Sequence, residues 1–259
     1  MNKEYNHTVW SQSKNIFRPF YLNNEKPPID KLPVGLYEYN YNINTDESYL
    51  TYKSDKFFFQ HEIYKIDDFN EIVLESYQKR GSSTGVLFNG KPGTGKTVHA
   101  KLLANNSNLP IVYIAMEPHK MLLNFITKIS QPVCWVFDEF EKYNINNYEN
   151  VMLSVLDGMG KNDIPHLFIF TTNSLNINDR FLCRPSRIRY IKTFDTLPHD
   201  FFVKYIKSNL NDQNLFDNVM SYVKNNLTID VVKSVVEEVN TIGFRKDILD
   251  TLNVKPKLI

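Results

Sequence analysis

Five short apolar runs mark the middle of the chain, between about residues 81 and 197. Each run is continuous rather than alternating, which is typical of strands buried on both faces of a parallel sheet. Helical patterns separate the runs, as in strand–helix–strand units. The runs are GVLFN, PIVYIA, VCWVFD, HLFIFTT and IRYIKTF. This part of the chain therefore predicts an α/β fold with a parallel sheet.

The N-terminal part of the chain alternates instead. Tyr37, Tyr39 and Tyr41 share one face of an alternating run, and Asn-Thr-Asp separates that run from a second one. Residues 35–55 therefore predict a β-hairpin. The three tyrosines form either an exposed contact surface or a covered face, and the pattern leaves both open. Residues 56–66, KFFFQHEIYKI, predict another strand.

Helical patterns flank the α/β part. Residues 67–81, DDFNEIVLESYQKRG, predict a helix that begins at one of its two aspartates and ends at its glycine. The side chains expected on its buried face are Phe69, Ile72, Val73 and Tyr77. The C-terminal residues contain no strand-like run and predict four short helices. We divide the chain into a β-rich N-terminal module with a linker helix (1–80), an α/β subdomain (81–197) and a helical subdomain (198–259).

The composition is that of a soluble globular protein, with 42% hydrophobic and 23% charged residues. A net charge of +1 creates no global field that would favour nucleic acid. No apolar run approaches the roughly 18 residues of a membrane span, and MNKEYNHTVW lacks the apolar stretch of a signal peptide. Two cysteines without metal spacing fit a reducing compartment. We expect a cytoplasmic protein, in the host cytoplasm if the Asn- and Lys-rich composition reflects a viral, AT-rich genome.

The sequence GKPGTGKT, residues 90–97, fits the pattern G-x-x-x-x-G-K-[ST] between a strand pattern and a helix pattern. Glycines let backbone N–H groups point into one concavity, and the following helix N-terminus adds partial positive charge. Lys96 would reach the β- and γ-phosphates of a nucleotide, and the Thr97 hydroxyl would ligate Mg²⁺. A plain glycine-rich turn is the alternative. The nucleotide-binding residues expected here are Gly90, Pro92, Gly93, Thr94, Gly95, Lys96, Thr97 and Val98.

Two acidic residues, Asp138 and Glu139, end the third apolar run. In a phosphate-binding α/β domain the carboxyl ends of the strands lie beside the phosphates. Asp138 would hold Mg²⁺, and Glu139 would polarise the attacking water as general base. An ordinary helix cap is the alternative. Glu141 and Lys142, which follow, are expected to be solvated or locally paired.

Polar residues also follow the fourth run. Asn173 could position the lytic water or sense the γ-phosphate, with a turn residue as the alternative. Arg184 and Arg187 flank Pro-Ser further along, and arginine suits the stabilisation of charge on a transferring phosphoryl group. These arginines should not reach the nucleotide of their own chain but could reach that of a neighbour. A surface salt bridge is the alternative.

The order of these motifs resembles that of the AAA+ ATPases, and of the AAA clade in particular. GKPGTGKT, FDE, VMLSVLDGM, TTN and RPSR carry the resemblance, which covers roughly residues 81–255. It implies a five-stranded parallel sheet with a helical lid, and ATP with Mg²⁺ bound at the subunit interfaces of a ring, usually of six. The roles implied are Walker A for Lys96 and Thr97, Walker B for Asp138 and Glu139, sensor 1 for Asn173, and arginine fingers for Arg184 and Arg187.

Two features depart from the clade. The segment between the second and third runs is short and lacks an aromatic-hydrophobic-glycine pore loop, and Phe125 falls in a helical pattern typical of core packing. A similar shortening occurs in the mitochondrial AAA proteins that translocate the folded Rieske protein. Arg245 stands in TIGFRKDIL, where other AAA+ clades place a sensor 2 arginine that contacts the γ-phosphate. A solvent-facing helix start is the alternative. The resemblance also places Ile63 and Tyr64 near adenine.

We therefore expect a Mg²⁺-dependent ATPase that forms a ring, as a hexamer, and remodels or translocates a protein client. Two alternatives stay open. One is a nucleic-acid-associated AAA+ ATPase, such as a helicase loader, clamp loader or replication factor. The other is a nucleotide-gated scaffold that binds ATP and scarcely hydrolyses it.

Overall fold

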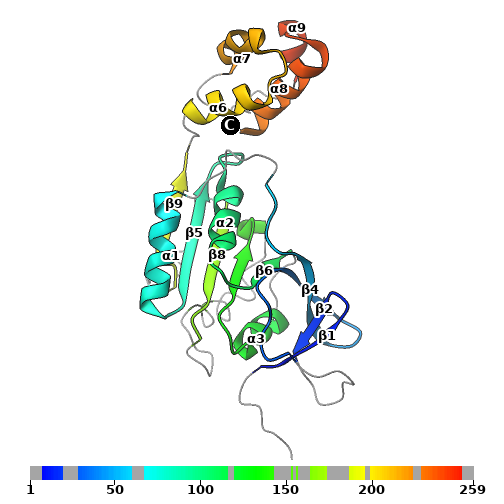
Figure 1. The fold of residues 1–259 in the computed structure, drawn as a ribbon, viewed down its shortest axis with the longest axis vertical. Helices are drawn as coiled ribbons and strands as arrows, with labels where there is room; N and C mark the ends of the chain where they lie inside the picture. Colours follow the sequence, from blue (N-terminus) through cyan, green and yellow to red (C-terminus); the bar gives the residue numbers. More distant parts are fainter. Residues whose placement is uncertain are drawn as a thin grey trace, which may run out of the picture.

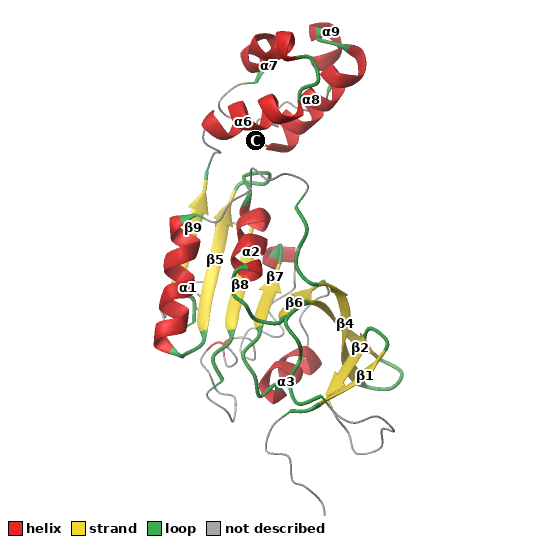
Figure 2. Ribbon diagram, in the orientation of Figure 1, coloured by secondary structure: helices red, strands yellow, loops and turns green. Residues whose placement is uncertain are grey.

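The computed structural model describes residues 8–19, 29–59, 67–115, 120–142, 153, 156, 164–173, 187–195, 199–223 and 229–252. Within these residues, one nine-stranded sheet joins the α/β part to the N-terminal region (Figure 1). A group of helices follows the sheet at the C-terminal end of the chain (Figure 2).

Five parallel strands form the centre of the sheet, in the order β6-β7-β8-β5-β9. They are β5 (Thr84–Gly90), β6 (Ile111–Ile114), β7 (Cys134–Phe137), β8 (Leu167–Thr172) and β9 (Tyr190–Phe194). Each of the five apolar runs coincides with one of these strands to within a residue or two, so the predicted parallel sheet is confirmed.

Helices cover both faces of this parallel sheet. Helices α1 (Asp68–Arg80) and α2 (Lys96–Asn105) pack on one face, and α3 (Lys120–Lys128) packs on the other. Successive strand side chains point to opposite faces, so Val86 and Phe88 join the core under α1 and α2, while Leu87 joins the core under α3. This two-sided burial explains why the strands read as continuous apolar runs.

The N-terminal region adds four antiparallel strands in the order β1-β2-β4-β3. They are β1 (Trp10–Ser13), β2 (Ile16–Pro19), β3 (Leu36–Asn42) and β4 (Glu47–Ser54). The predicted hairpin is therefore confirmed. Strand β3 also pairs with β6 in parallel, so the N-terminal strands extend the central sheet. The division of the chain at residue 80 stays a prediction about folding units, because the sheet itself runs across it.

The tyrosines of the hairpin lie on a covered face. Tyr37 and Tyr39 are each 1% exposed, and Tyr41 packs against the same core. The Tyr39 ring meets Phe125 of α3 edge-on, with ring centroids 5.3 Å apart. Phe125 is itself 3% exposed, as its helical pattern predicted. The open question about the tyrosines is thus answered in favour of packing.

Of two predictions from the first 80 residues, the first is contradicted only where it can be tested, and the second is wrong. Residues 56–59 form no strand, and residues 60–66 lie outside the described part of the chain. In helix α1, Ile72 is 58% exposed, whereas Asn70 is buried. The Asn70 side chain donates a hydrogen bond to the carbonyl of His99 in α2, at 3.2 Å. The buried face of α1 therefore includes a polar contact to α2 beside its apolar side chains. The helix begins after Asp67 and ends at Gly81, as predicted.

The C-terminal helices have a core of their own. They are α6 (His199–Asn209), the 3₁₀ turn η3 (Gln213–Leu215), α7 (Phe216–Tyr222), α8 (Ile229–Ile242) and α9 (Lys246–Leu249). The four helices predicted from the sequence are confirmed. Val232, Val235, Val236 and Val239 of α8 recur at helical spacing and are buried. At the start of α8, the Ile229 N–H donates to the carbonyl of Gly93, at 3.1 Å, so this helical group touches the GKPGTGKT loop.

Candidate active site

The loop GKPGTGKT connects β5 to α2 at the carboxyl end of the parallel strands. Gly90, Gly93 and Gly95 have φ values of 135°, 69° and 95°, a region that glycine enters without steric cost. The carbonyl of Lys91 accepts hydrogen bonds from Thr94 Oγ1 at 2.7 Å and from Lys96 Nζ at 2.6 Å. The loop therefore curls around the ammonium group of Lys96, with helix α2 beginning at that residue. Pro92 lies in the loop, and Val98 lies in the first turn of α2.

Lys96 is buried, at 5% exposed, and faces three carboxylates. Burial lowers the pKa of its ammonium group, and the negative charges of Glu141, Asp138 and Glu139 oppose that shift. A desolvated cation needs an anionic partner. An ammonium at the start of a helix, inside a glycine-rich loop, suits a polyphosphate.

Asp138 joins the loop to two neighbouring elements. It follows β7, and its Oδ1 accepts hydrogen bonds from Thr97 Oγ1 at 2.9 Å and from Thr171 Oγ1 at 2.6 Å. Thr97 and Asp138 together present a hydroxyl and a carboxylate, the hard oxygen donors that Mg²⁺ prefers. No group of three or more His, Cys, Asp or Glu side chains that could hold a metal occurs among the described residues. In proteins, Mg²⁺ usually takes one or two carboxylates and completes its shell with phosphates and waters.

Tyr113 of β6 approaches the same carboxylate. Burial raises the pKa of Tyr113 to about 12, and the charges of Asp138 and Glu139, together with a hydrogen bond to Asp138, act in the same direction. The Tyr113 ring also meets Phe57 edge-on, with ring centroids 6.0 Å apart. This contact was not predicted, because the local pattern marks Tyr113 only as a strand residue.

Glu139 occupies a strained position. Its φ is 52°, in the left-handed region that residues other than glycine rarely enter. Its backbone N–H donates to Thr171 Oγ1 at 2.8 Å, so one hydroxyl holds both Asp138 and Glu139. The Glu139 carboxylate pairs with Lys142, and both side chains are well exposed. Such an exposed pair contributes little, which leaves the carboxylate free to turn toward a substrate.

Asn173 follows β8 and is bound by Glu141. The backbone N–H and the side-chain Nδ2 of Asn173 both donate to Oε1 of Glu141, at 2.9 and 2.7 Å. The expectation that Glu141 is solvated or locally paired is wrong, because its partner lies 32 residues further along. Lys142 is locally paired, as expected. The structure thus brings Lys96, Thr97, Asp138 and Asn173 to one edge of the sheet.

The main chain of Arg187 lies at the opposite edge of the sheet. A Cβ added to Gly85 would stand 2.0 Å from the carbonyl oxygen of Arg187, and the Arg189 N–H donates to the Gly85 carbonyl at 2.8 Å. Gly85 precedes Gly90 by five positions on β5, or about 16 Å at about 3.3 Å per residue. This separation exceeds the length of one arginine side chain. Arg184, like Ile63 and Tyr64, lies outside the described residues.

Arg245 is not brought to the phosphate-binding loop. It immediately precedes α9, and its guanidinium pairs with Asp247 at 3.0 Å, with side chains 58% and 65% exposed. Helix α9 lies at the end of the helical group farther from the loop (Figure 1). This placement agrees with the solvent-facing alternative for Arg245.

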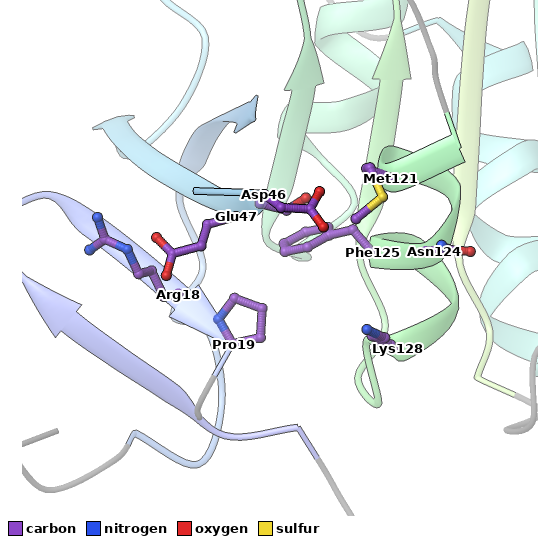
Figure 3. Close-up of a pocket in the computed structure, with 9 residues that line it drawn as sticks. Arg18, Pro19, Asp46, Glu47, Met121, Asn124, Phe125 and Lys128 are labelled. Atoms are coloured by element: carbon purple, nitrogen blue, oxygen red, sulfur yellow. The ribbon is translucent and has the colours of Figure 1, made fainter. Parts of the chain in front are cut away.

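A separate groove of about 220 Å³ lies between α3 and the N-terminal strands. Figure 3 shows Phe125 and Met121 of α3 facing Arg18, Pro19 and Glu47 across it. The groove shares no residue with the site around Lys96. No helix among the described residues is long and apolar enough to cross a membrane.

Comparison with known proteins finds a match for the central part of the chain. The family described as "ATPase family associated with various cellular activities (AAA)" matches residues 86–196. The chain is also 30% identical, over 150 residues, to "ATP-dependent zinc metalloprotease FtsH 2" of Thermoanaerobacter sp. (strain X514). That match covers 47% of this chain and 29% of the relative, so the chain corresponds to less than a third of that protein. The central part of the chain, residues 86–196, is thus similar to that ATPase family, and the sheet order and the loop at Lys96 agree with this similarity.

Proposed function

We propose that this chain binds ATP with Mg²⁺ and hydrolyses it in a ring of identical subunits, and that hydrolysis drives the remodelling or translocation of a protein client. The proposal depends most on one observation. The groups that would bind and cleave the γ-phosphate gather at one edge of the sheet, and Arg187 lies about 16 Å away at the other, as judged from strand rise. Such a chain holds two halves of an active site that cannot meet within one copy.

The reaction we propose is the attack of water on the γ-phosphorus, with cleavage of the bond to the β,γ-bridging oxygen. The loop N–H groups and Lys96 would hold the phosphates. Thr97 and Asp138 would hold Mg²⁺, which, when bound, neutralises charge on the β- and γ-phosphates. Glu139 would turn from Lys142 and accept a proton from the water, and the amide of Asn173 would orient that water or the γ-phosphate.

The arginines would complete the site from a neighbouring subunit. A head-to-tail contact joins one edge of each copy to the other edge of the next, and repeats into a ring if its rotation closes. Arg187, and Arg184 beside it in the sequence, would then face the neighbour's nucleotide and stabilise the charge on the transferring phosphoryl group. Because each interface would contain nucleotide, loss of the γ-phosphate would change contacts between subunits.

The protein client is supported by the relative and by charge. The name of the bacterial relative describes an ATP-dependent protease, a protein that acts on proteins. This chain carries a net charge of only +1, which offers nucleic acid no general attraction. A direct comparison is the stimulation of ATP turnover by an unfolded protein and by single-stranded DNA. Strong stimulation by DNA that falls steeply with added salt would favour a nucleic-acid machine instead.

Mixing two inactive variants tests the shared site. Glu139→Gln lacks the general base but keeps its arginines, and Arg184→Ala/Arg187→Ala lacks the arginines but keeps the base. Each should be inactive alone, and mixed rings should regain turnover, because the base of one variant then meets the arginines of the other. A mixture of Glu139→Gln with Asn173→Ala is the matched control and should stay inactive, since both changes fall in the same half-site. The absence of recovery in the first mixture would exclude a site shared between copies.

A further inference from the structure

Glu141 holds Asn173 at two points with one oxygen atom. Its Oε1 accepts the backbone N–H of Asn173 at 2.9 Å and the side-chain Nδ2 at 2.7 Å. The first bond fixes the main chain just after β8, and the second fixes the side chain. A terminal amide at a strand end would otherwise rotate freely. Glu141 thus defines where the amide lies.

The same contact also determines the orientation of the Asn173 side-chain amide. A carboxylate only accepts hydrogen bonds, whereas an amide has a donating nitrogen and an accepting oxygen. The nitrogen of Asn173 must therefore face Glu141. One N–H of Nδ2 is used in that bond, and the carbonyl oxygen and the second N–H are left to meet a ligand.

Glu141 is itself held on a rigid base. It lies in the 3₁₀ turn η1 (Phe140–Lys142), directly after the buried residue Phe140. The ring of Phe140 contacts Phe170 of β8 at 5.0 Å and Phe137 of β7 at 6.3 Å, and the latter two rings stack at 5.0 Å. Three aromatic rings therefore connect the turn to both strands that carry site residues. Functional groups supported in this way are held more precisely than groups on free loops.

The other oxygen of Glu141 is a buried acceptor at the same site. Oε2 has no hydrogen-bond partner among the described residues, and leaving a buried acceptor unpaired costs stability. Of the three carboxylates that face the ammonium of Lys96, Glu141 has the largest influence on it. Packing alone gives no reason to retain an unpaired carboxylate oxygen beside this cation. Retention of such a group at a site is typical of a functional role.

We propose that Glu141 is a positioning residue for ATP hydrolysis, which fixes the amide of Asn173 so that it meets the γ-phosphate and the attacking water in one orientation. Glu141 acts through Asn173 and forms no bond to the reacting atoms. The proposal rests on the proposed ATPase function. It adds to that function a residue whose partner, 32 positions away, only the fold brings near.

The test compares two substitutions of similar size. Glu141→Gln keeps a carbonyl oxygen that can accept both hydrogen bonds, and Glu141→Met keeps the volume without a comparable acceptor. Glu141→Met should lower kcat about tenfold to a hundredfold, the effect of small misplacements in active sites, and should change KM by less than about threefold, since the main phosphate contacts are retained. Glu141→Gln should retain kcat within about fivefold, since the acceptor is present. If Glu141→Met does not fold, Glu141→Ala replaces it in the same comparison.

A double-mutant cycle separates this role from general support of the site. If Glu141 acts through Asn173, then Glu141→Met should lower kcat no further in an Asn173→Ala background. The proposal would be overturned if the fold-loss in kcat of the double variant equalled the product of the fold-losses of the two single variants. So would equal losses in Glu141→Gln and Glu141→Met, because they would show that the acceptor is irrelevant.

A binding measurement keeps the inference testable without turnover. In a Glu139→Gln background, fluorescent ATP and ADP analogues report how strongly the site prefers the triphosphate. Adding Glu141→Met should reduce that preference about threefold to tenfold, the effect of losing one hydrogen bond to a charged group. An unchanged preference would contradict the proposal. If the native chain shows no hydrolysis but this preference falls as expected, the proposed ATPase function fails, and only the positioning of Asn173 toward the γ-phosphate by Glu141 is supported.

Discussion

Thr171→Val should uncouple the two acidic residues of the site from the sheet. The Thr171 hydroxyl donates to Asp138 Oδ1 at 2.6 Å and accepts from the Glu139 N–H at 2.8 Å. Thr171 is 1% exposed, so valine would fill the same space without the hydroxyl. The hydrogen bond to a carboxylate contributes about 1.5–3 kcal/mol and the neutral one about 1 kcal/mol, together about 3 kcal/mol. Part of this loss is offset, because releasing Glu139 from its φ of 52° relieves about 1–2 kcal/mol of backbone strain.

The expected net destabilisation is therefore about 1–2 kcal/mol, which for a domain of this size lowers the melting temperature by about 2–8 °C. Catalysis should suffer more than stability. Glu139 would relax to an ordinary φ, and Asp138 would lose its link to β8, so we expect kcat to fall at least about tenfold. Thermal unfolding followed by circular dichroism gives the first quantity, and phosphate release under saturating ATP and Mg²⁺ gives the second.

Thr171→Ser is the matched control. It keeps the hydroxyl and loses one methyl group, so it should cost a similar amount of stability, about 1 kcal/mol, and retain most of the turnover. If Thr171→Val hydrolysed ATP as fast as Thr171→Ser, the hydroxyl would not position the acidic pair, and the argument would be wrong. Equal melting temperatures for the native chain and Thr171→Val would refute the energetic part alone.

Three further predictions concern other parts of the fold. Burial lowers the pKa of His166 to about 4 from 6.5, and its Nδ1 accepts a hydrogen bond from Trp135 Nε1 at 3.3 Å. As the pH is lowered, the unfolded chain therefore binds a proton at this histidine before the folded chain does. The free energy of unfolding should fall by about 3 kcal/mol as the pH is lowered from 6.5 to 4. His166→Gln keeps an acceptor without this titration, so a urea-unfolding series that shows the same pH slope in that variant would contradict the assignment. Tyr39→Ala should cost about 3–5 kcal/mol by denaturant unfolding, because this side chain is 1% exposed; a loss below about 1 kcal/mol would favour an exposed contact surface instead. Gly85→Ala should displace the Arg187 carbonyl, which would stand 2.0 Å from the new Cβ. The change should lower stability by at least about 1–3 kcal/mol and should also lower the turnover that depends on the proposed ring. A variant with unchanged stability and turnover would contradict the close packing of β5 and β9.

The sequence predicted the parallel sheet and the edge at which the site lies, for a clear physical reason. Strands buried on both faces must be apolar throughout, and polar residues directly after them fall at the carboxyl ends of the strands. Parallel strands bring these ends together whatever the intervening loops contain. The placement of Asp138 and Asn173 near Lys96 therefore followed from local patterns alone.

What the sequence did not predict depends on partners far away in the chain. KFFF resembled a strand, but the Phe57 N–H and carbonyl bind the side chain of Asn105, each at 2.9 Å, where strand partners would otherwise stand. Ile72 is exposed against expectation, and Asn70 is buried, where its amide reaches a carbonyl in α2. The neighbours of Glu141 in the sequence suggested solvent, and its partner is 32 residues away. In each case a side chain forms a hydrogen bond with a residue far away in the sequence, which the local sequence pattern does not predict.

The N-terminal strands are connected to the nucleotide site through backbone hydrogen bonds. In the sheet, Glu38 of β3 stands opposite Tyr113 of β6, and Tyr113 opposite Val136 of β7, two residues before Asp138. The charge of Asp138 also contributes to the raised pKa of Tyr113, after burial. A segment joined to the domain only by a flexible linker could move without altering Asp138. These strands, however, cannot shift along β6 without breaking the backbone hydrogen bonds between β3 and β6 or moving Tyr113 with them. Only two strand-to-strand contacts, between β3 and β6 and between β6 and β7, therefore separate the N-terminal strands from the strand that Asp138 follows.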